Sequence, residues 1–170
     1  MRERSTVYVA GTFNRFHRGH EVLIDAALDE SATLTRFGVP TEMMVCVLED
    51  APARLARSVP VRPFAERLAD VQAYVASGIM DSSELEGACS QGMLMVSFMP
   101  IPDAGWTDPE LQDDDVIVCS RETEPKVRAM LASRPDRGRF IGVRVVPMMR
   151  DETGREIHST LLAMILDCKR

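Results

Sequence analysis

The sequence predicts a single α/β domain built on a mainly parallel β-sheet, and three observations carry this prediction. The chain has 170 residues, the length of one ordinary domain. Apolar, β-branched segments alternate along it with segments whose apolar residues recur at helical spacing. No internal repeat, low-complexity segment or linker interrupts the alternation. Because strands that alternate with helices form parallel βαβ units, we expect one domain over residues 1–170.

Apolar runs bounded by polar or turn-forming residues mark the expected strands. The first is rich in β-branched and aromatic residues and stops at Gly11. Two of the later runs contain pairs or clusters of methionine, which we expect to fill the core. The five expected strands cover residues 5–10, 41–48, 93–98, 116–119 and 139–147.

Helical periodicity appears in four segments between and after these strands. In one of them Phe64, Leu68, Val71 and Val75 fall on a single face. The four expected helices cover residues 19–36, 64–76, 124–134 and 158–168. We interpret the polar, glycine-containing residues 77–92 as a connection and the aspartates at 113–115 as a solvated turn. The result is a Rossmann-like, doubly wound five-stranded sheet with helices on both faces.

Composition excludes several classes of protein. A net charge of −6 argues against a nucleic-acid-binding protein, which needs clustered Lys and Arg. The apolar runs are far shorter than the roughly 20 residues that cross a bilayer, and the N-terminus lacks a secretory signal pattern. We therefore expect a cytoplasmic protein without membrane contact. Its cysteines stand singly, so we expect buried thiols and neither a zinc site nor a disulfide framework: Cys46, Cys89, Cys119 and Cys168.

The first strand-to-helix turn, residues 11–20, has the sequence GTFNRFHRGH. Ligands of open α/β sheets bind at the carboxyl ends of the strands, where this turn lies. His17 and His20 are three residues apart at the expected helix start, with Gly19 between them, so both rings can point the same way. The free backbone N–H groups of the first helical turn and the helix dipole add an anion site. The turn therefore suits a phosphate.

Phosphoryl and nucleotidyl transfer are the reactions that such a turn favours. Charge in these reactions spreads over the oxygens of a crowded phosphorus centre, and fixed donors aimed there lower the barrier without a covalent intermediate. The two histidines and Thr12 would be these donors. A histidine by itself is more often structural, but the ordered combination of strand, Gly-Thr-Phe, His-x-Gly-His and helix favours a functional role.

The segment VYVAGTFNRFHRGHEVLIDAA resembles the T/HxGH signature of the nucleotidyltransferase superfamily. Within it, the similarity is greatest to the archaeal and eukaryotic-type phosphopantetheine adenylyltransferases. Three later segments fit in the same order: VRPFAER at 61–67, VIVCSRET at 116–123 and REIHST at 155–160. The last is similar to the family's ISSTRIR segment, so the resemblance spans nearly the whole chain.

This resemblance implies transfer of an adenylyl group from ATP to the terminal phosphate of 4′-phosphopantetheine, giving dephospho-CoA and pyrophosphate. Mg²⁺ would neutralise the triphosphate, with no metal held by the protein itself. His17 and His20 would contact the ATP phosphates as catalytic residues, and Thr12 would help to hold the attacking phosphate. Because the acceptor is already an anion, no general base is needed.

The resemblance also implies nucleotide-binding residues in three loops. They are Gly11, Thr12, Phe13, His17, Gly19 and His20 in the first loop, Ser120, Glu122 and Thr123 in the second, and Ser159 and Thr160 in the third. The residues of the second loop would lie beside the adenosine, and Ser159 and Thr160 would donate to the β and γ phosphates, or would simply cap the last helix.

The chain departs from the family pattern at several positions. Asn14 stands where Asp is common, and Ala53 aligns with a lysine that reaches the phosphates. Arg54 would then be the cation on the acceptor phosphate, or Arg57 in its place. After the Ser-Thr pair, Leu161 replaces an arginine. Arginine is not equivalent to lysine at such a site, because its planar guanidinium differs from a point charge.

These departures keep two other functions open. One is a cytidylyltransferase that acts on a sugar, alcohol or phosphonate phosphate. The other is a nucleotide-binding protein of low catalytic activity with a regulatory or scaffold role. Arg62 and Arg67 could face the phosphates, but we expect both to be solvated partners of Glu66 or Asp70. The sequence does not indicate an oligomeric state.

Overall fold

The computed structural model describes residues 4–55, 59–103, 111–134 and 141–150, together with Gly154 and Glu156. Strands and helices alternate over these residues, except for one run of three successive helices and one pair of successive strands. In chain order the elements are β1 (Ser5–Gly11), α1 (Arg18–Arg36), β2 (Thr41–Leu48), α2 (Asp50–Leu55), α3 (Phe64–Met80), α4 (Ser83–Ser90), β3 (Leu94–Ile101), β4 (Val116–Ser120), α5 (Glu124–Ala132) and β5 (Gly142–Val146).

All five strands described form one parallel sheet in the order β3-β2-β1-β4-β5. The chain builds the sheet outward from β1 to β3, then returns to the other side of β1 for β4 and β5. This reversal places a topological switch point between β1 and β4, where open α/β sheets bind ligands. The predicted α/β class and the doubly wound, parallel five-stranded sheet are confirmed.

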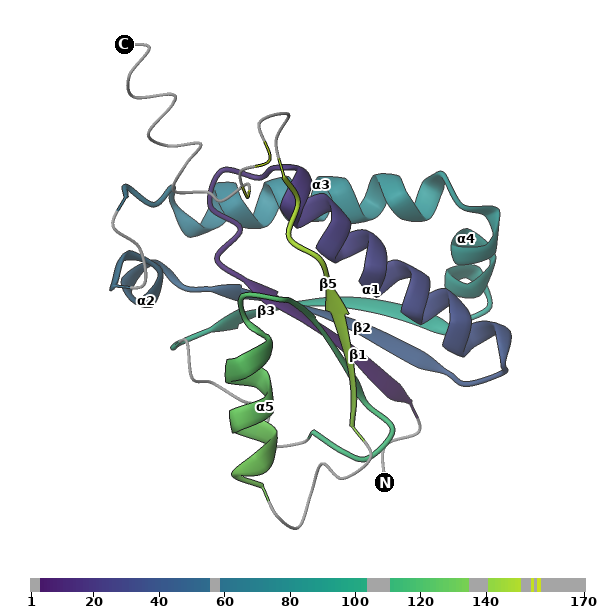
Figure 1. Cartoon of the computed structure of the whole chain (residues 1–170). Helices are drawn as coiled ribbons and strands as arrows, with labels where there is room; N and C mark the ends of the chain where they lie inside the picture. The colour runs from purple at the N-terminus through teal and green to yellow at the C-terminus, as the bar shows by residue number, and fades with distance from the viewer. Residues whose placement is uncertain are drawn as a thin grey trace.

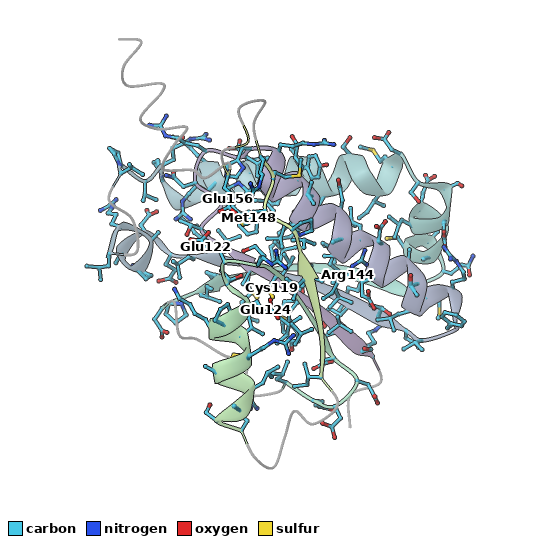
Figure 2. All side chains as sticks on the ribbon, viewed as in Figure 1. Cys119, Glu122, Glu124, Arg144, Met148 and Glu156 are labelled. Carbon is cyan, nitrogen blue, oxygen red and sulfur yellow. The ribbon has the colours of Figure 1, made fainter. Side chains whose placement is uncertain are left out.

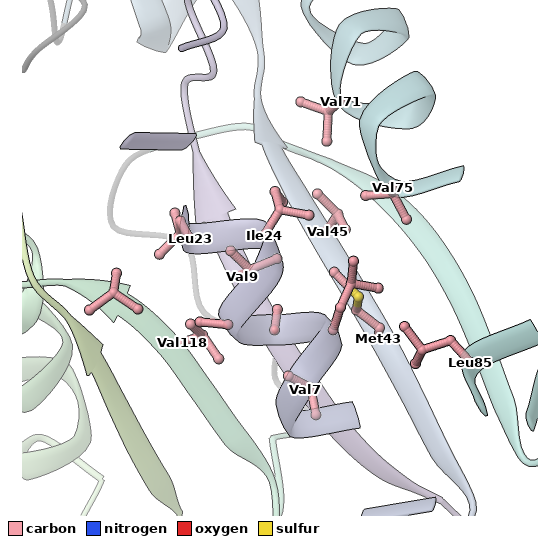
Figure 3. Close-up of a cluster of buried hydrophobic side chains, with 14 of the residues drawn as sticks. Val7, Val9, Leu23, Ile24, Met43, Val45, Val71, Val75, Leu85 and Val118 are labelled. Carbon is pink, nitrogen blue, oxygen red and sulfur yellow. The ribbon is translucent and has the colours of Figure 1, made fainter. Parts of the chain in front are cut away.

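Helices cover both faces of this sheet (Figure 1). On one face lie α1, α3 and α4, and on the other lies α5. Alternate side chains of a strand point to opposite faces, so Val7 and Val9 of β1 pack under Ile24 of α1, as Figure 3 shows. Tyr8 faces the second core cluster, to which Met130 of α5 contributes. Because both faces are buried, the central strands are continuous apolar runs.

Two helices, α2 and α4, were not predicted from the sequence. Residues 77–92 are not a connection, because α3 continues to Met80 and α4 follows. Leu85 is the fully buried residue of α4, and the partly buried Ala88 and Cys89 pack beside it, so the apolar stripe of this eight-residue helix is too short to give a clear helical period. Its start is instead marked by Ser82, whose Oγ accepts a 3.3 Å hydrogen bond from the backbone N of Leu85. The other helix, α2, has six residues and includes a proline.

The expectation of a solvated turn at 113–115 is wrong for Asp115. This carboxylate is 2% exposed, and it accepts hydrogen bonds from the backbone N of Thr6 and of Gln112, both at 2.8 Å. It thereby ties the start of β1 to the segment before β4. Cys46 and Cys119 are buried, as expected.

Several expectations fall outside the described residues. These are the helix at 158–168, the first part of the strand at 139–147 and the thiol of Cys168. Within the described ranges, no helix is long and apolar enough to cross a membrane.

Candidate functional site

The turn between β1 and α1 has an unusual backbone. Phe13 and Arg15 have φ values of +50° and +52°, in the left-handed region that side chains other than glycine rarely adopt. Gly11 allows the chain to fold back, because a Cβ there would lie 3.2 Å from the Phe13 ring. Each left-handed residue costs about 1 kcal/mol or more, so surrounding contacts must hold the turn in this form.

His17 caps the N-terminus of α1 with its own ring. Its backbone is extended, and its Nδ1 accepts a 3.0 Å hydrogen bond from the backbone N of Gly19. A ring nitrogen that accepts a hydrogen bond carries no proton, so the neutral imidazole carries its proton on Nε2. The donor atom of the His17 ring is therefore Nε2.

His20 lies directly against His17. The two ring centroids are 3.9 Å apart with an angle of 28° between the planes, so the imidazoles stack. Phe13 and Phe16 flank His20, at centroid distances of 5.2 and 5.5 Å. The ring of Phe13 has no exposed surface. The Phe13 ring therefore supports His20 from the core.

The expectation of free amides in the first turn of α1 is wrong for two of them. The backbone N of Gly19 donates to the His17 ring, and that of His20 donates to the His17 carbonyl at 2.8 Å. The cap and a tight first turn use these donors. An anion at this helix end would therefore meet the imidazoles and the helix dipole, and not these backbone groups.

Arg67 is fully buried beneath the site, which corrects its assignment as a solvated surface residue. Its Nη1 donates to the carbonyls of Thr12 and Leu48 at 2.6 and 2.8 Å. Its Nε donates to the carbonyl of Arg62 at 2.8 Å, and its Nη2 pairs with Asp50 at 2.9 Å. One guanidinium thus joins the ends of β1 and β2 to the start of α3.

The spacing of Arg67 from the apolar residues of α3 could have predicted its burial. Phe64, Arg67 and Val71 stand at positions i, i+3 and i+7, which places the arginine on the apolar face of α3. Arg62 behaves as expected, since it forms ion pairs with Glu66 and Asp70.

Asn14 fixes the same turn from its other side. The residue has no exposed surface, its Nδ2 donates to the carbonyl of Pro60 at 3.1 Å, and its Oδ1 accepts from the backbone N of Arg62 at 3.0 Å. The amide uses both a donor and an acceptor. An aspartate could supply only the acceptor, so this departure from the family pattern is matched to its surroundings.

The second predicted loop begins where β4 ends. Continuing the register of β1 and β4 places Gly11 beside Ser120. The Ser120 and Thr123 hydroxyls lie 3.1 Å apart, and the backbone N of Thr123 donates to the Ser120 carbonyl at 3.0 Å. Glu122 is exposed, and Figure 2 shows Cys119, Glu122 and Glu124 running from the end of β4 into α5. The two predicted loops therefore meet at the switch point.

The expected cation sites lie at the end of β2. Ala53 is fully buried in the second core cluster, so its position does not face the site. Arg54 is exposed on α2.

The end of β1 is accessible from solvent. Ala10 of this central strand is exposed, on the face of the sheet that α5 covers elsewhere. Ser159 and Thr160 lie outside the described residues, as do Arg57 and Leu161.

The fold and this turn define an α/β nucleotidyltransferase: a parallel sheet carries, at its switch point, a Gly-Thr-Phe turn and two stacked imidazoles at a helix start. No protein-family model matches the chain. The chain is 32% identical over 158 residues to a phosphopantetheine adenylyltransferase of Methanopyrus kandleri. This match covers 92% of the chain and 87% of the relative. The chain belongs to the phosphopantetheine adenylyltransferase family.

A second relative agrees with this family, and a solved structure shares the fold. The phosphopantetheine adenylyltransferase of Methanothermobacter thermautotrophicus is 30% identical over 160 residues, or 94% of this chain and 83% of the relative. A crystal structure of a protein with unknown function from Archaeoglobus fulgidus has a TM-score of 0.60 and 25% identity. That match covers 84% of this chain and 98% of the other, so nearly the entire fold is shared.

Proposed function

We propose that this chain transfers an adenylyl group from ATP to 4′-phosphopantetheine, producing dephospho-CoA and pyrophosphate in coenzyme A biosynthesis. The observation that carries the proposal is the stacked pair His17 and His20 at the carboxyl end of the central strand. The two archaeal relatives bear the name of this reaction.

The histidines would act on the phosphorus centre under attack. An oxygen of the acceptor phosphate forms a bond to the α-phosphorus of ATP, and the bond to the oxygen bridging the α and β phosphates breaks, releasing pyrophosphate. Negative charge grows on that bridging oxygen, and the Nε2–H of His17 and the ring of His20 would stabilise it. Thr12 and Arg54 would hold the acceptor phosphate, which is already ionised and needs no base.

The remaining nucleotide contacts extend from the same switch point. Ser120, Glu122 and Thr123 would adjoin the adenosine, and Ser159 and Thr160 would bind the β and γ phosphates. The part of the chain that the structure describes holds no group of three His, Cys, Asp or Glu side chains placed to bind a metal ion. In this proposal Mg²⁺ would accompany the triphosphate, neutralise its charge and so favour departure of pyrophosphate.

A matrix of two nucleotides and several acceptors tests this function. Pyrophosphate release is measured with ATP or CTP, each paired with phosphopantetheine or with sugar, alcohol and phosphonate phosphates. We expect turnover with ATP and phosphopantetheine, with dephospho-CoA identified by mass. Turnover only with CTP, or ATP binding without pyrophosphate release on any acceptor, would overturn the proposal.

A further inference from the structure

A concave site lies between the β1–α1 turn and α3. It is a cleft of about 710 Å³, within the range of small-molecule sites. The turn contributes Arg15 and Phe16 to its wall, and α3 contributes Ala73, Tyr74 and Ser77. None of the predicted nucleotide-site residues lines it, so the cleft is separate from that site.

Arg15 is the unusual group of this cleft. It is half-buried, it makes no hydrogen bond or ion pair with another described residue, and its buried Nε has no hydrogen-bond partner. Arg62, on the same cleft, is by contrast paired with Glu66 and Asp70. A partly desolvated cation without a counter-ion is costly, and the left-handed backbone of Arg15 adds to that cost. An anion bound in the cleft would offset it.

The rest of the wall is suited to an apolar group. The rings of Phe16 and Tyr74 lie 5.3 Å apart between centroids. The Tyr74 hydroxyl already donates to Asp25 at 2.9 Å, so this residue offers a ligand chiefly its ring. Asp70 is neutralised by its pair with Arg62, which reduces its repulsion of an anion.

We propose that this cleft binds a small organic anion, whose carboxylate or phosphate pairs with Arg15 and whose apolar part packs on Phe16 and Tyr74. This site does not depend on the adenylyl-transfer reaction proposed above. Phe16 also contacts His20, at 5.5 Å between ring centroids, so an occupant of the cleft touches a residue that supports the imidazole pair. Binding in the cleft would therefore act on the histidines through Phe16.

Two alanine methyl groups report on the two sites separately. Ala73 lines the cleft, whereas the exposed Ala10 lies at the end of β1 beside the nucleotide site. The protein, labelled with carbon-13 at alanine methyl groups, is titrated by NMR with phenyl phosphate and with benzoate. We expect saturable shifts of the Ala73 signal with at least one of the two, which also identifies the preferred anion. Inorganic phosphate and benzyl alcohol, each with half of the required chemistry, should bind at least tenfold more weakly.

Variants test the role of charge. Arg15→Gln should weaken binding of the preferred probe at least tenfold, whereas Arg128→Gln, an equal charge change on α5 where Arg128 pairs with Glu124, should leave it unchanged. Ala73→Glu adds a carboxylate to the wall at an exposed helix position and should abolish binding measured by calorimetry. Absence of saturable binding, shifts confined to Ala10, or unchanged affinity in both cleft variants would overturn the proposal.

Discussion

A single buried amide, that of Asn14, joins the histidine-bearing turn to the segment before α3. It donates to the Pro60 carbonyl and accepts from the backbone N of Arg62. Buried polar groups that lose a partner cost roughly 1–3 kcal/mol. The position of the turn, including its two left-handed residues, therefore depends on an amide and not on a carboxylate.

Asn14→Asp should destabilise the protein by about 1–3 kcal/mol at neutral pH, because it removes the donor and buries a charge against a carbonyl. Denaturant unfolding measures the change. Gln72→Glu makes the same chemical change at an exposed position of α3 and serves as the control. The loss should shrink toward about pH 4, where a protonated carboxyl regains a donor. Equal stability of Asn14→Asp and the parent protein at neutral pH would contradict this assignment.

The convergence of the two imidazoles was predictable from the sequence, but the hydrogen bonds of the turn were not. The order Gly-Thr-Phe, His-x-Gly-His predicted two converging imidazoles, and the rings do stack. His17 uses its Nδ1 to cap α1, and so occupies an amide that was expected to be free. This contact depends on one side-chain rotamer. Sequence spacing does not specify rotamers, so only the folded structure determines which donors remain at the helix start.

At the scale of elements, Arg67 holds three chain segments together at the end of the sheet. Its donors reach the carbonyls of Thr12, Leu48 and Arg62 and the carboxylate of Asp50. Removing a buried cation with this many partners leaves several hydrogen-bond acceptors without a donor. The turn that carries the histidines is therefore coupled to β2, α2 and α3.

Arg67→Met should lower the free energy of unfolding by about 3–5 kcal/mol, since a similar volume is kept while the partners are left unpaired. Arg36→Met removes an arginine from an exposed pair with Glu84 and should change stability far less. Both are compared by denaturant titration at the same pH. A similar effect in the two variants would show that Arg67 is no more important than a surface arginine.

Tyr74 links α3 to α1 through its hydrogen bond to Asp25. Burial, and then this hydrogen bond, raise the pKa of Tyr74 to about 12. The folded-state pKa is therefore above the ordinary value of about 10, and the neutral phenol stabilises the fold. This contribution is fully present below about pH 10 and is lost as the pH rises through about 12.

An ultraviolet titration of tyrosinate should accordingly show Tyr74 ionising near pH 12, a component that is missing in Tyr74→Phe, where Tyr8 is the remaining tyrosine. The stability advantage of the parent over Tyr74→Phe should narrow between about pH 10 and 12. Ionisation of Tyr74 at the ordinary value for tyrosine would rule out this role.

How well each element was predicted follows from how much of it is buried. The central strands are buried on both faces and stand out as apolar runs, whereas α4 buries Leu85 fully and Ala88 and Cys89 in part, a stripe too short to give a clear helical period. Asp115 was missed for a related reason. A run of aspartates is typical of a solvated turn, and only the fold brings the backbone of Thr6 to the last of them.

At the scale of the whole molecule, the order of the strands explains why the site lies where it does. The reversal of the chain on the two sides of β1 places the β1–α1 turn next to the end of β4. The fold thereby brings the turn that follows β1 beside the loop that follows β4, although the two are about one hundred positions apart along the chain. Membership of the phosphopantetheine adenylyltransferase family agrees with this arrangement.

The central claim is that the imidazole pair stabilises the phosphorus centre under attack, and His17→Asn tests it most directly. Asparagine is a good helix cap, so this variant keeps the start of α1 while removing the Nε2–H donor. The measurement is the rate of pyrophosphate release at saturating ATP and phosphopantetheine, with the melting temperature recorded alongside. We expect a fall of about 10²–10³ in kcat with a nearly unchanged melting temperature. A folded His17→Asn protein with the parent's kcat would contradict the account.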